Sequence, residues 1–262
     1  MKDLEEARNI IDKCDKELVK IFERRLNAVL DVLEYKRKHA LPIFQGQREK
    51  EVFKKVNSYL QNDEFSNELD LLYGQILKIS RQVQSKALFP FNIIIIGFMG
   101  SGKTSVGMEL SKLLEMKYMD TDEIIIKNTN MSINHIFEKF GEGRFRELEA
   151  NTLEDLQNIN NTIISCGGGI ILNPKNIKLL KQLGKVIWLK VSPKEAYNRL
   201  LGDSSRPLLK DDFSLTNLTN ILEKRLTLYE NASDIIIETD GKNFGEICDE
   251  IIKNLLKCDS KI

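Results

Sequence analysis

The chain has 262 residues, enough for two domains, and its 39 lysine and arginine residues balance its 39 aspartates and glutamates. This balance argues against nucleic acid or a membrane surface as a partner, because both attract proteins of net positive charge. Four cysteines without a C-x-x-C pair and only two histidines predict neither a disulfide framework nor a zinc site. Since no apolar run reaches about 18 residues and the N-terminus is highly charged, a cytoplasmic protein is expected.

The first part of the chain, residues 1–88, has a helical pattern of apolar residues and no strand pattern. It predicts an all-α domain of three helices: a long first helix, a second from about Arg48 to Leu60 and a third from about Ser66 to Lys86. In the first helix, apolar residues recur at steps of three and four and form a seam. The seam consists of Leu4, Ala7, Ile11, Cys14, Leu18, Ile21, Ala28 and Val32.

Arg25 stands in this seam at a position where an apolar residue is expected. Lys36 follows 11 residues later on the same face, about three turns and roughly 16 Å away, and Arg48 begins the second helix. A buried cluster of these three cations lacks enough nearby acid to neutralise it, so a dianionic ligand would supply the missing charge. Alternatively, Arg25 extends its charged end out of the seam or pairs with a glutamate.

Arg8 cannot join this cluster on a straight helix. It precedes Arg25 by 17 residues, which places it about 25 Å away and turned by about 100°. Either Arg8 is a surface residue, or it serves a second copy of the site on a partner chain.

The ordered set R-x6-D-x9-R-x10-K, a proline loop, R-E and a late S-x3-Q resembles the all-helical chorismate mutases over residues 4–86. Its members are Arg8, Asp15, Arg25, Lys36, Pro42, Arg48, Glu49, Ser80 and Gln84. The resemblance implies an intertwined homodimer, in which the long first helix crosses into the partner and Arg8 completes the other chain's site. It also implies the rearrangement of chorismate to prephenate, for which the protein must select the compact conformer and stabilise developing charge.

The same resemblance implies how chorismate is held. Arg8 from the partner, Arg25 and Arg48 would bind its two carboxylates. Lys36 and Gln84 would donate hydrogen bonds to its ether oxygen.

Three further residues complete this implied site. Glu49 would hold the ring hydroxyl, and Ser80 and Gln45 would contact the substrate. Many relatives carry an aspartate where this chain has Gln45. Because glutamine can still accept a hydrogen bond, weakened or retuned substrate binding is expected rather than loss of activity.

After the junction KALFPF, with Pro90 as its stop signal, the pattern changes to short β-branched runs that alternate with helical stretches. This alternation predicts an α/β domain over residues 91–262, with a five-stranded parallel sheet covered by helices. The predicted strands are the runs NIIIIG, KYMD, NTIISCGGG, KVIWLKV and SDIIIET.

The segment GFMGSGKTS, from Gly97 to Ser105, fits the phosphate-binding pattern G-x4-G-K-[ST] and lies between a predicted strand and a predicted helix. Its glycines let backbone N–H groups surround phosphates, Lys103 reaches the outer phosphates, and Thr104 offers a hydroxyl to Mg²⁺. A chance glycine turn is the alternative, which this context disfavours. The predicted nucleotide-binding residues of this P-loop are Gly100, Ser101, Gly102, Lys103, Thr104 and Ser105.

Candidate residues for the phosphate acceptor follow the next two strands. Asp120 could assist the metal and Asp122 could accept a hydrogen bond from an acceptor hydroxyl, although either could instead cap the next helix. The three glycines of CGGGI favour a close approach of the backbone to a ligand. Arginines in GRFRELE, GDSSRPLLKDD and EKRLTLYENA could grip an anionic acceptor or close over the phosphate, although each alone is more often a surface charge.

Together these segments resemble shikimate kinase over residues 92–257. The P-loop, D-T-D, F-R-x-x-E, G-G-G, R-P-L and R-x3-Y occur in its order and spacing. The resemblance implies phosphorylation of the shikimate 3-hydroxyl by ATP with Mg²⁺. The residues that would hold shikimate are Asp122, Arg146, Gly168 and Arg225.

On the nucleotide side, the resemblance places Thr104 and Asp120 at Mg²⁺ and Arg199 against the adenine. Arg206, in the R-P-L segment, would bridge the phosphates from a lid. The residues assigned to catalysis of phosphoryl transfer are Lys103, Asp122 and Arg206.

Both resemblances are to enzymes of the shikimate pathway to aromatic amino acids. The chain is therefore predicted to be a bifunctional enzyme that acts on shikimate and chorismate. The two reactions are not adjacent steps, so direct channelling does not follow. The alternative is that the helical domain is a non-catalytic dimerisation module or a sensor of chorismate or prephenate, attached to an active kinase. The intact pair of Lys36 and Gln84 argues against this alternative.

Overall fold

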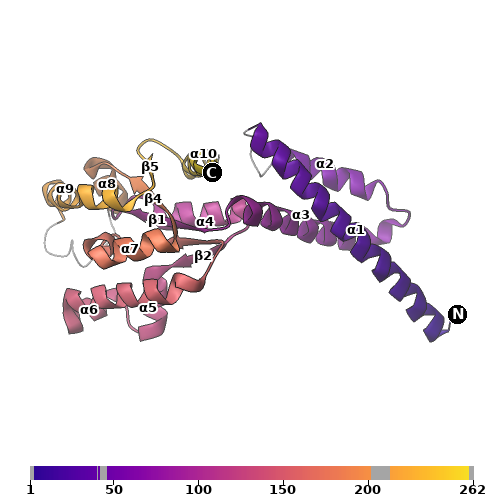
Figure 1. Cartoon of the computed structure of the whole chain (residues 1–262), viewed down its shortest axis with the longest axis horizontal. Coiled ribbons are helices and arrows are strands. Elements are labelled where there is room, and N and C mark those ends of the chain that lie inside the picture. Colours follow the sequence, from indigo (N-terminus) through magenta and orange to yellow (C-terminus); the bar gives the residue numbers. More distant parts are fainter. Residues whose placement is uncertain (1–2, 40, 42–45, 202–212, 260–262) are drawn as a thin grey trace. The chain divides into compact units, whose positions relative to one another are not determined.

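The computed structural model describes residues 3–39, 41, 46–201 and 213–259. The chain divides into two compact units, residues 1–88 and 89–262. The described part of the first unit is helical, and the second unit is built around a sheet (Figure 1). Among the described helices, none combines the length and the apolar character needed to cross a membrane.

The described residues of the first unit contain three α-helices, as the periodicity predicts: α1 (Leu4–Lys38), α2 (Gly46–Asn57) and α3 (Ser66–Leu88), with the short 3₁₀ helix η1 (Asp63–Phe65) between the last two. Both α1 and α2 pack against α3. The bounds of α2 differ from the expected ones at both ends, because helix ends carry a weaker sequence signal than the repeating apolar face.

The apolar seam of α1 is largely uncovered in a single chain. Leu4, Ile11, Leu18, Ile21 and Val32 each expose at least half of their surface, whereas the buried residue of this helix is Leu33. An apolar row of this length is more extensive than the scattered exposed side chains of an ordinary monomer surface.

The second unit contains a five-stranded, wholly parallel sheet in the order β2-β3-β1-β4-β5. The strands are β1 (Asn92–Gly97), β2 (Lys117–Asp120), β3 (Thr162–Ser165), β4 (Gly184–Lys190) and β5 (Ile235–Glu238). Four of them fall within the predicted runs, and β4 begins one residue before its run, at Gly184. All six residues of the central β1 are buried, as expected for a parallel strand covered on both faces. Each buried isoleucine there contributes about 1.5–3 kcal/mol.

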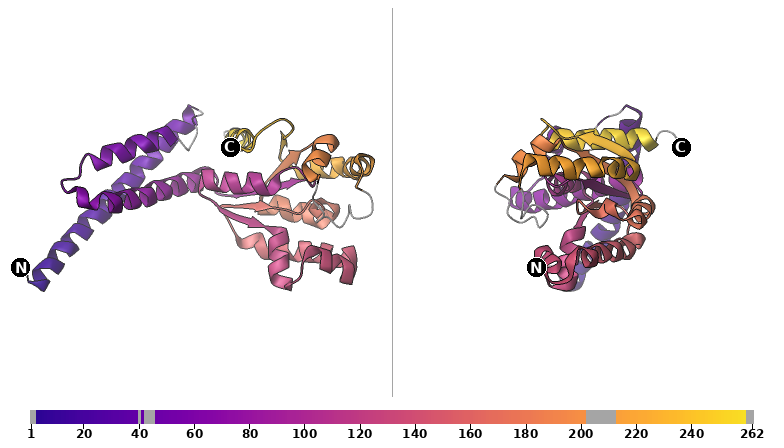
Figure 2. Two further views of the ribbon diagram at one scale, coloured as in Figure 1. Left: turned by 180° about the vertical axis from the view of Figure 1, so that it is seen from behind. Right: turned by 90° about the vertical axis from the view of Figure 1, so that its left-hand side faces the viewer.

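Helices cover both faces of this sheet, and Figure 2 shows the arrangement from two further sides. On one face, α4 (Lys103–Leu114) packs against β1, β2 and β3, and α10 (Phe244–Asp259) packs against α4 and β5. On the other face, α7 (Pro174–Leu183) and α9 (Leu215–Ala232) contact β4, and α8 (Pro193–Leu200) packs against α9. The stacked rings of Trp188 and Tyr229 lie in the core of this second face.

Two helices after β2 form a smaller subdomain: α5 (Thr121–Thr129) and α6 (Ile133–Asp155) pack on each other around Ile125, Ile136 and Phe145. Two 3₁₀ turns, η2 (Leu156–Asn158) and η3 (Ile170–Leu172), flank β3. Because the strands are parallel, their carboxyl ends meet at one edge of the sheet, and the segments that follow β1, β2 and β3 are gathered there.

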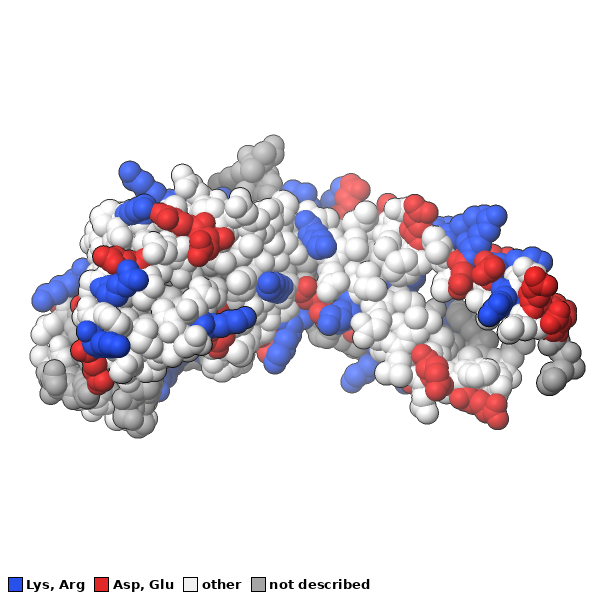
Figure 3. Space-filling view, turned by 90° about the horizontal axis from the view of Figure 1, so that it is seen from below, with Lys and Arg blue, Asp and Glu red and all other residues white. Residues whose placement is uncertain are grey.

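The surface agrees with the balanced composition. On the face drawn in Figure 3, basic and acidic side chains are interspersed over each unit, without an extended region of one sign.

Candidate active sites

A phosphate-binding turn joins β1 to α4. Gly100 and Gly102 adopt left-handed φ angles of 77° and 88° that disfavour other residues, and Gly102 is the residue before α4. The Lys103 ammonium group donates to Phe98 O at 3.0 Å, so its side chain lies over the turn. The hydroxyl of Ser101 is buried and has no hydrogen-bond partner in the described protein. A cradle of backbone N–H groups with an unsatisfied hydroxyl fits a bound phosphate.

A cavity of about 640 Å³ opens beside this turn. One wall consists of the P-loop and the start of α4, and the other of α8 and the segment at the start of α10, where Phe244 lies. Arg199 lines it and is held in place by Glu195 (2.9 Å) and by Thr239 O (3.1 Å). The volume lies within the usual range for small-molecule sites, so a nucleotide fits here.

Asp120 ends β2 and has two partners. Its Oδ1 accepts a hydrogen bond from the Asp122 backbone N–H (2.9 Å), which caps α5, and its Oδ2 accepts from the Tyr118 hydroxyl (3.3 Å). Burial, together with the Asp120 charge, raises the pKa of Tyr118 to about 12. The Thr104 side chain lies close to Tyr118 and opposes this shift. Asp120 therefore caps α5 with one oxygen, while its other oxygen accepts from Tyr118 near Thr104.

The oxygen atoms of Thr104 and Asp120 are of the type that Mg²⁺ prefers. Within the described ranges, no group of three or more carboxylate, histidine or cysteine side chains could hold a metal ion alone. Mg²⁺ normally keeps phosphate and water ligands beside one or two protein oxygens, so a hydroxyl and a carboxylate next to a phosphate cradle fit this ion.

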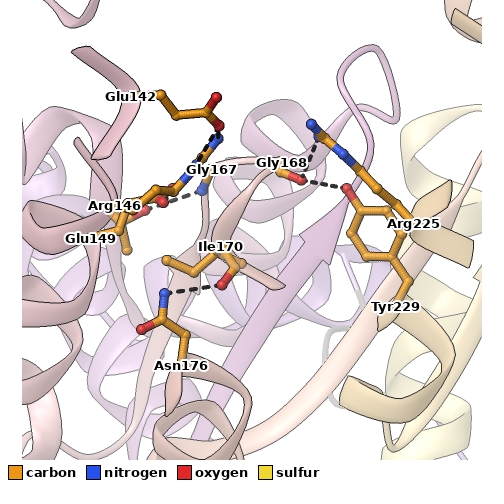
Figure 4. A network of polar contacts seen from close by, with 10 residues as sticks. Glu142, Arg146, Glu149, Gly167, Gly168, Ile170, Asn176, Arg225 and Tyr229 are labelled. Carbon is orange, nitrogen blue, oxygen red and sulfur yellow. Dashed lines mark hydrogen bonds and ion pairs between the residues drawn. The ribbon is translucent and has the colours of Figure 1, made fainter. Parts of the chain in front are cut away.

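The three glycines after β3 form a turn against which charged side chains pack (Figure 4). A Cβ at Gly167 would lie 2.7 Å from Asp122 Oδ1, and one at Gly169 would overlap the Arg146 guanidinium. The carbonyl of Gly168 accepts hydrogen bonds from Tyr229 (2.6 Å) and Arg225 (3.3 Å). The structure thus brings the four predicted shikimate residues Asp122, Arg146, Gly168 and Arg225 to one turn.

Two glutamates of α6 fix Arg146, at spacings of three and four residues. Its Nη1 donates to Glu149 (2.7 Å) and its Nη2 to Glu142 (2.6 Å), as Figure 4 shows. The pKa of Glu149 is raised to about 7, chiefly by burial. The charge of Asp122 contributes to this rise, and Arg146 opposes it. Because burial disfavours the charged form of Glu149, its ion pair with Arg146 carries the energetic cost of removing the carboxylate from water.

The first unit gathers a second polar cluster, between α1 and α3. Arg25 Nη1 donates to Ser80 Oγ at 2.6 Å, and Gln84 Nε2 donates to Val29 O at 3.4 Å. Burial lowers the pKa of both Arg25 and Lys36; Glu49 opposes this shift at Lys36. Arg25 therefore faces α3 in this cluster, with a serine rather than a glutamate as its hydrogen-bond partner.

Two other cations predicted for this site, Arg48 and Arg8, are exposed. Arg48 forms an exposed ion pair with Glu51 (3.0 Å) on its own helix. Arg8 is exposed near the start of α1, and within one chain it does not reach Arg25. An additional cation, Arg81, forms a half-buried ion pair with Glu49.

Comparison with known proteins decides the family. Residues 99–256, more than half of the chain, match the family model described as shikimate kinase. The chain belongs to the shikimate kinase family. Residues 7–85 match the model described as chorismate mutase type II, so both the kinase and the mutase family are detected in one chain.

Individual relatives agree with this assignment of the shikimate kinase unit. The shikimate kinase of Caldicellulosiruptor bescii is 42% identical over 149 residues, which cover 57% of this chain and 86% of the relative. That of Thermodesulfovibrio yellowstonii is 41% identical over 162 residues, covering 62% and 93%. The structure of shikimate kinase from Acinetobacter baumannii in complex with shikimate has a TM-score of 0.64 and 34% identity, covering 66% of this chain and 98% of that one.

Sequence reasoning missed several residues of the two sites. Phe244, which lines the cavity beside the P-loop, belongs to no motif, and Arg81 follows Ser80 without a periodic signal. The Arg146 partner Glu142 could have been found from its spacing of four residues on a helix. Two predicted site residues, Gln45 and Arg206, and the loop residue Pro42 lie outside the described residues, so their roles stay predictions.

Proposed function

We propose that the second unit transfers the terminal phosphoryl group of ATP to the 3-hydroxyl of shikimate through the site described above. The observation that carries this proposal is the meeting of two sites at one sheet edge: the phosphate cradle with its cavity, and the turn that gathers Asp122, Arg146, Gly168 and Arg225. The complex of the Acinetobacter baumannii enzyme with shikimate supports the choice of substrate.

The chain's own residues act mainly by positioning and charge. Arg146 and Arg225 bind the carboxylate of shikimate, and Asp122 accepts a hydrogen bond from its reacting hydroxyl. Lys103 turns from Phe98 O to the transferring phosphate. Thr104 and Asp120 would hold Mg²⁺, which would offset the charge of the phosphates.

An assay of ADP release with shikimate as acceptor tests this proposal. Lys103→Ala should abolish phosphorylation, because it removes the cation at the phosphate, while turnover of chorismate stays nearly intact. Lys112→Ala, an exposed lysine of the same helix, is the matched control and should leave both activities unchanged. A folded wild-type chain that releases no ADP with shikimate contradicts the kinase proposal; equal loss of both activities in Lys103→Ala contradicts two separate sites.

We infer that the first unit converts chorismate to prephenate. The half-buried Arg25 donates to the buried Ser80, and Lys36 and Gln84 lie on the same two helices, which supports a polar site for a dianion. Arg25 and Arg48 bind carboxylates, Lys36 and Gln84 donate to the ether oxygen, and Glu49 holds the ring hydroxyl. Consumption of chorismate by the full chain is the test: a chain that binds chorismate without consuming it has a sensing domain instead.

The mutase proposal includes a homodimer in which Arg8 acts across the interface, supported by the exposed apolar row of α1. Arg8→Ala and Arg48→Ala homodimers should each lose roughly two to three orders of magnitude in mutase rate, since a carboxylate is left unpaired. Co-refolding the two variants yields about half heterodimers, each with one intact site of two, so roughly a quarter of the activity returns. Verified heterodimers without activity contradict the proposal.

A cytoplasmic location stays a prediction.

A further inference from the structure

Tyr118 is the residue from which this inference starts. It lies in the middle of β2, and its hydroxyl donates to Asp120 Oδ2 at 3.3 Å. Burial and the Asp120 charge raise the pKa of this hydroxyl, and the nearby side chains of Thr104, at the start of α4, and Ser165, at the end of β3, oppose the shift. The phenol oxygen therefore lies close to α4 and β3 as well as to Asp120.

The backbone fixes where this hydroxyl lies. Tyr118 and Asp120 are two residues apart on a strand and so share one face of the sheet. Ser165 is the register partner of Asp120 on β3. The ring packs over α4 at Gly107, where a Cβ would lie 2.6 Å from Tyr118 Cε2. A glycine inside a helix costs about 1 kcal/mol relative to alanine, and here it provides the space that the ring occupies.

The hydrogen-bond chemistry has one consistent arrangement. An ionised carboxylate only accepts, so the phenol proton goes to Asp120. Asp120 Oδ2, held by the phenol, keeps a fixed orientation while Oδ1 caps α5.

We infer that Tyr118 is a positioning residue for Mg²⁺: its hydroxyl holds the Asp120 carboxylate in the orientation in which it would face the ion beside Thr104. The inference rests on the proposed function, which assigns these two residues to Mg²⁺. Groups that orient metal ligands typically contribute ten- to a hundredfold to metal affinity. Tyr118 does not touch the metal or the substrates in this arrangement.

Tyr118→Phe tests this role because it keeps the ring over Gly107 and removes only the hydroxyl. Binding of ADP to the full chain is measured by calorimetry, first in EDTA and then over a series of Mg²⁺ concentrations. We expect the Mg²⁺ midpoint to rise about tenfold in the variant, whereas ADP affinity in EDTA and the melting temperature without ligand stay unchanged. Tyr197→Phe, a half-buried tyrosine outside the cavity wall, is the matched control and should not change the midpoint.

A double-mutant cycle identifies the path of the effect. In an Asp120→Asn background, Tyr118→Phe should shift the midpoint much less, because the acceptor of its hydrogen bond is altered. An unchanged midpoint in Tyr118→Phe, or an equal loss of ADP affinity in EDTA, overturns the inference. If ADP binding by the wild-type chain does not depend on Mg²⁺, the assignment of Thr104 and Asp120 to Mg²⁺ fails, and the inference fails with it.

Discussion

The guanidinium of Arg146 covers the Cα atom of Gly169 so closely that a methyl group on that glycine would occupy the place of the guanidinium nitrogens. Two ion pairs, to Glu142 and Glu149, hold the guanidinium there. Gly169 has a φ of −101°, which alanine can adopt. A substitution at this glycine therefore acts through the contact with Arg146 and not through backbone strain.

Gly169→Ala should displace Arg146 and raise the KM for shikimate roughly ten- to a hundredfold, the cost of a lost hydrogen bond to a charged group. The KM for ATP should change little. Steady-state kinetics with each substrate varied in turn checks this. Gly143→Ala, in the same helix as Arg146 and with open space around its Cα, is the control. An unchanged KM for shikimate in Gly169→Ala removes Arg146 from the shikimate site.

Glu149 should make the stability of the second unit depend on pH. Its pKa is raised from 4.5 to about 7 by burial, so the folded state binds the proton more tightly than the unfolded state. The resulting stabilisation is complete below about pH 4.5 and is lost as the pH rises to about 7. Relative to wild type, Glu149→Gln should therefore gain stability over this range, by roughly 3 kcal/mol at most, since one pKa unit corresponds to about 1.4 kcal/mol.

Urea unfolding at several pH values measures this difference, followed by the fluorescence of Trp188, the single tryptophan, which is buried in this unit. Glu147→Gln, at an exposed position of the same helix, serves as control and should show a much smaller trend. A difference between wild type and Glu149→Gln that is independent of pH would show that the Glu149 carboxyl does not titrate in this range.

Phe244 should contribute to nucleotide affinity, because it forms part of the cavity wall and exposes 49% of its surface. Stacking of a base on an aromatic ring is worth about 1–3 kcal/mol, so Phe244→Ala should weaken ADP binding roughly tenfold or more. The KM for shikimate should stay the same. Phe140→Ala removes a ring of equal exposure (48%) outside the cavity and is the control. Equal ADP affinities of the two variants would place the adenine elsewhere.

Arg81 should influence mutase activity through Glu49. Its ion pair holds the Glu49 carboxylate, which also interacts electrostatically with Lys36. In Arg81→Met the carboxylate is free to pair with Lys36 and withdraw it from the substrate, so kcat for chorismate should fall about tenfold, the cost of roughly 1.4 kcal/mol. Kinase activity should not change. Arg24→Met, at an exposed position on α1, is the control, and an identical kcat in both variants contradicts the role of Arg81.

Much of this architecture follows from local patterns. The runs of β-branched residues predict all five strands, and the three-and-four periodicity predicts the helices of the first unit, because both patterns depend on neighbouring residues only. The P-loop and the Gly167–Gly169 turn are predictable for the same reason: each is a continuous segment whose geometry requires its glycines.

Residues that tertiary packing brings to a site are not predictable in this way. Phe244 reaches the nucleotide cavity because α10 packs beside α4, and Arg81 reaches Glu49 because α2 packs on α3. Asp120 shows a different limit, because the sequence left capping of a helix and binding of a metal as alternatives. In the structure Oδ1 caps α5 and Oδ2 accepts from Tyr118, so the cap occupies only one of the two carboxylate oxygens, and the metal role stays a prediction.

The uncovered apolar row of α1 has a consequence for measurements on the protein. If two chains must meet along that row to complete a mutase site, dilution separates them, and the mutase rate per chain falls with concentration. The kinase site described here is formed by one unit of one chain, so its rate per chain stays constant. The ratio of the two rates in a single sample would then report the fraction of paired chains, without any measurement of size.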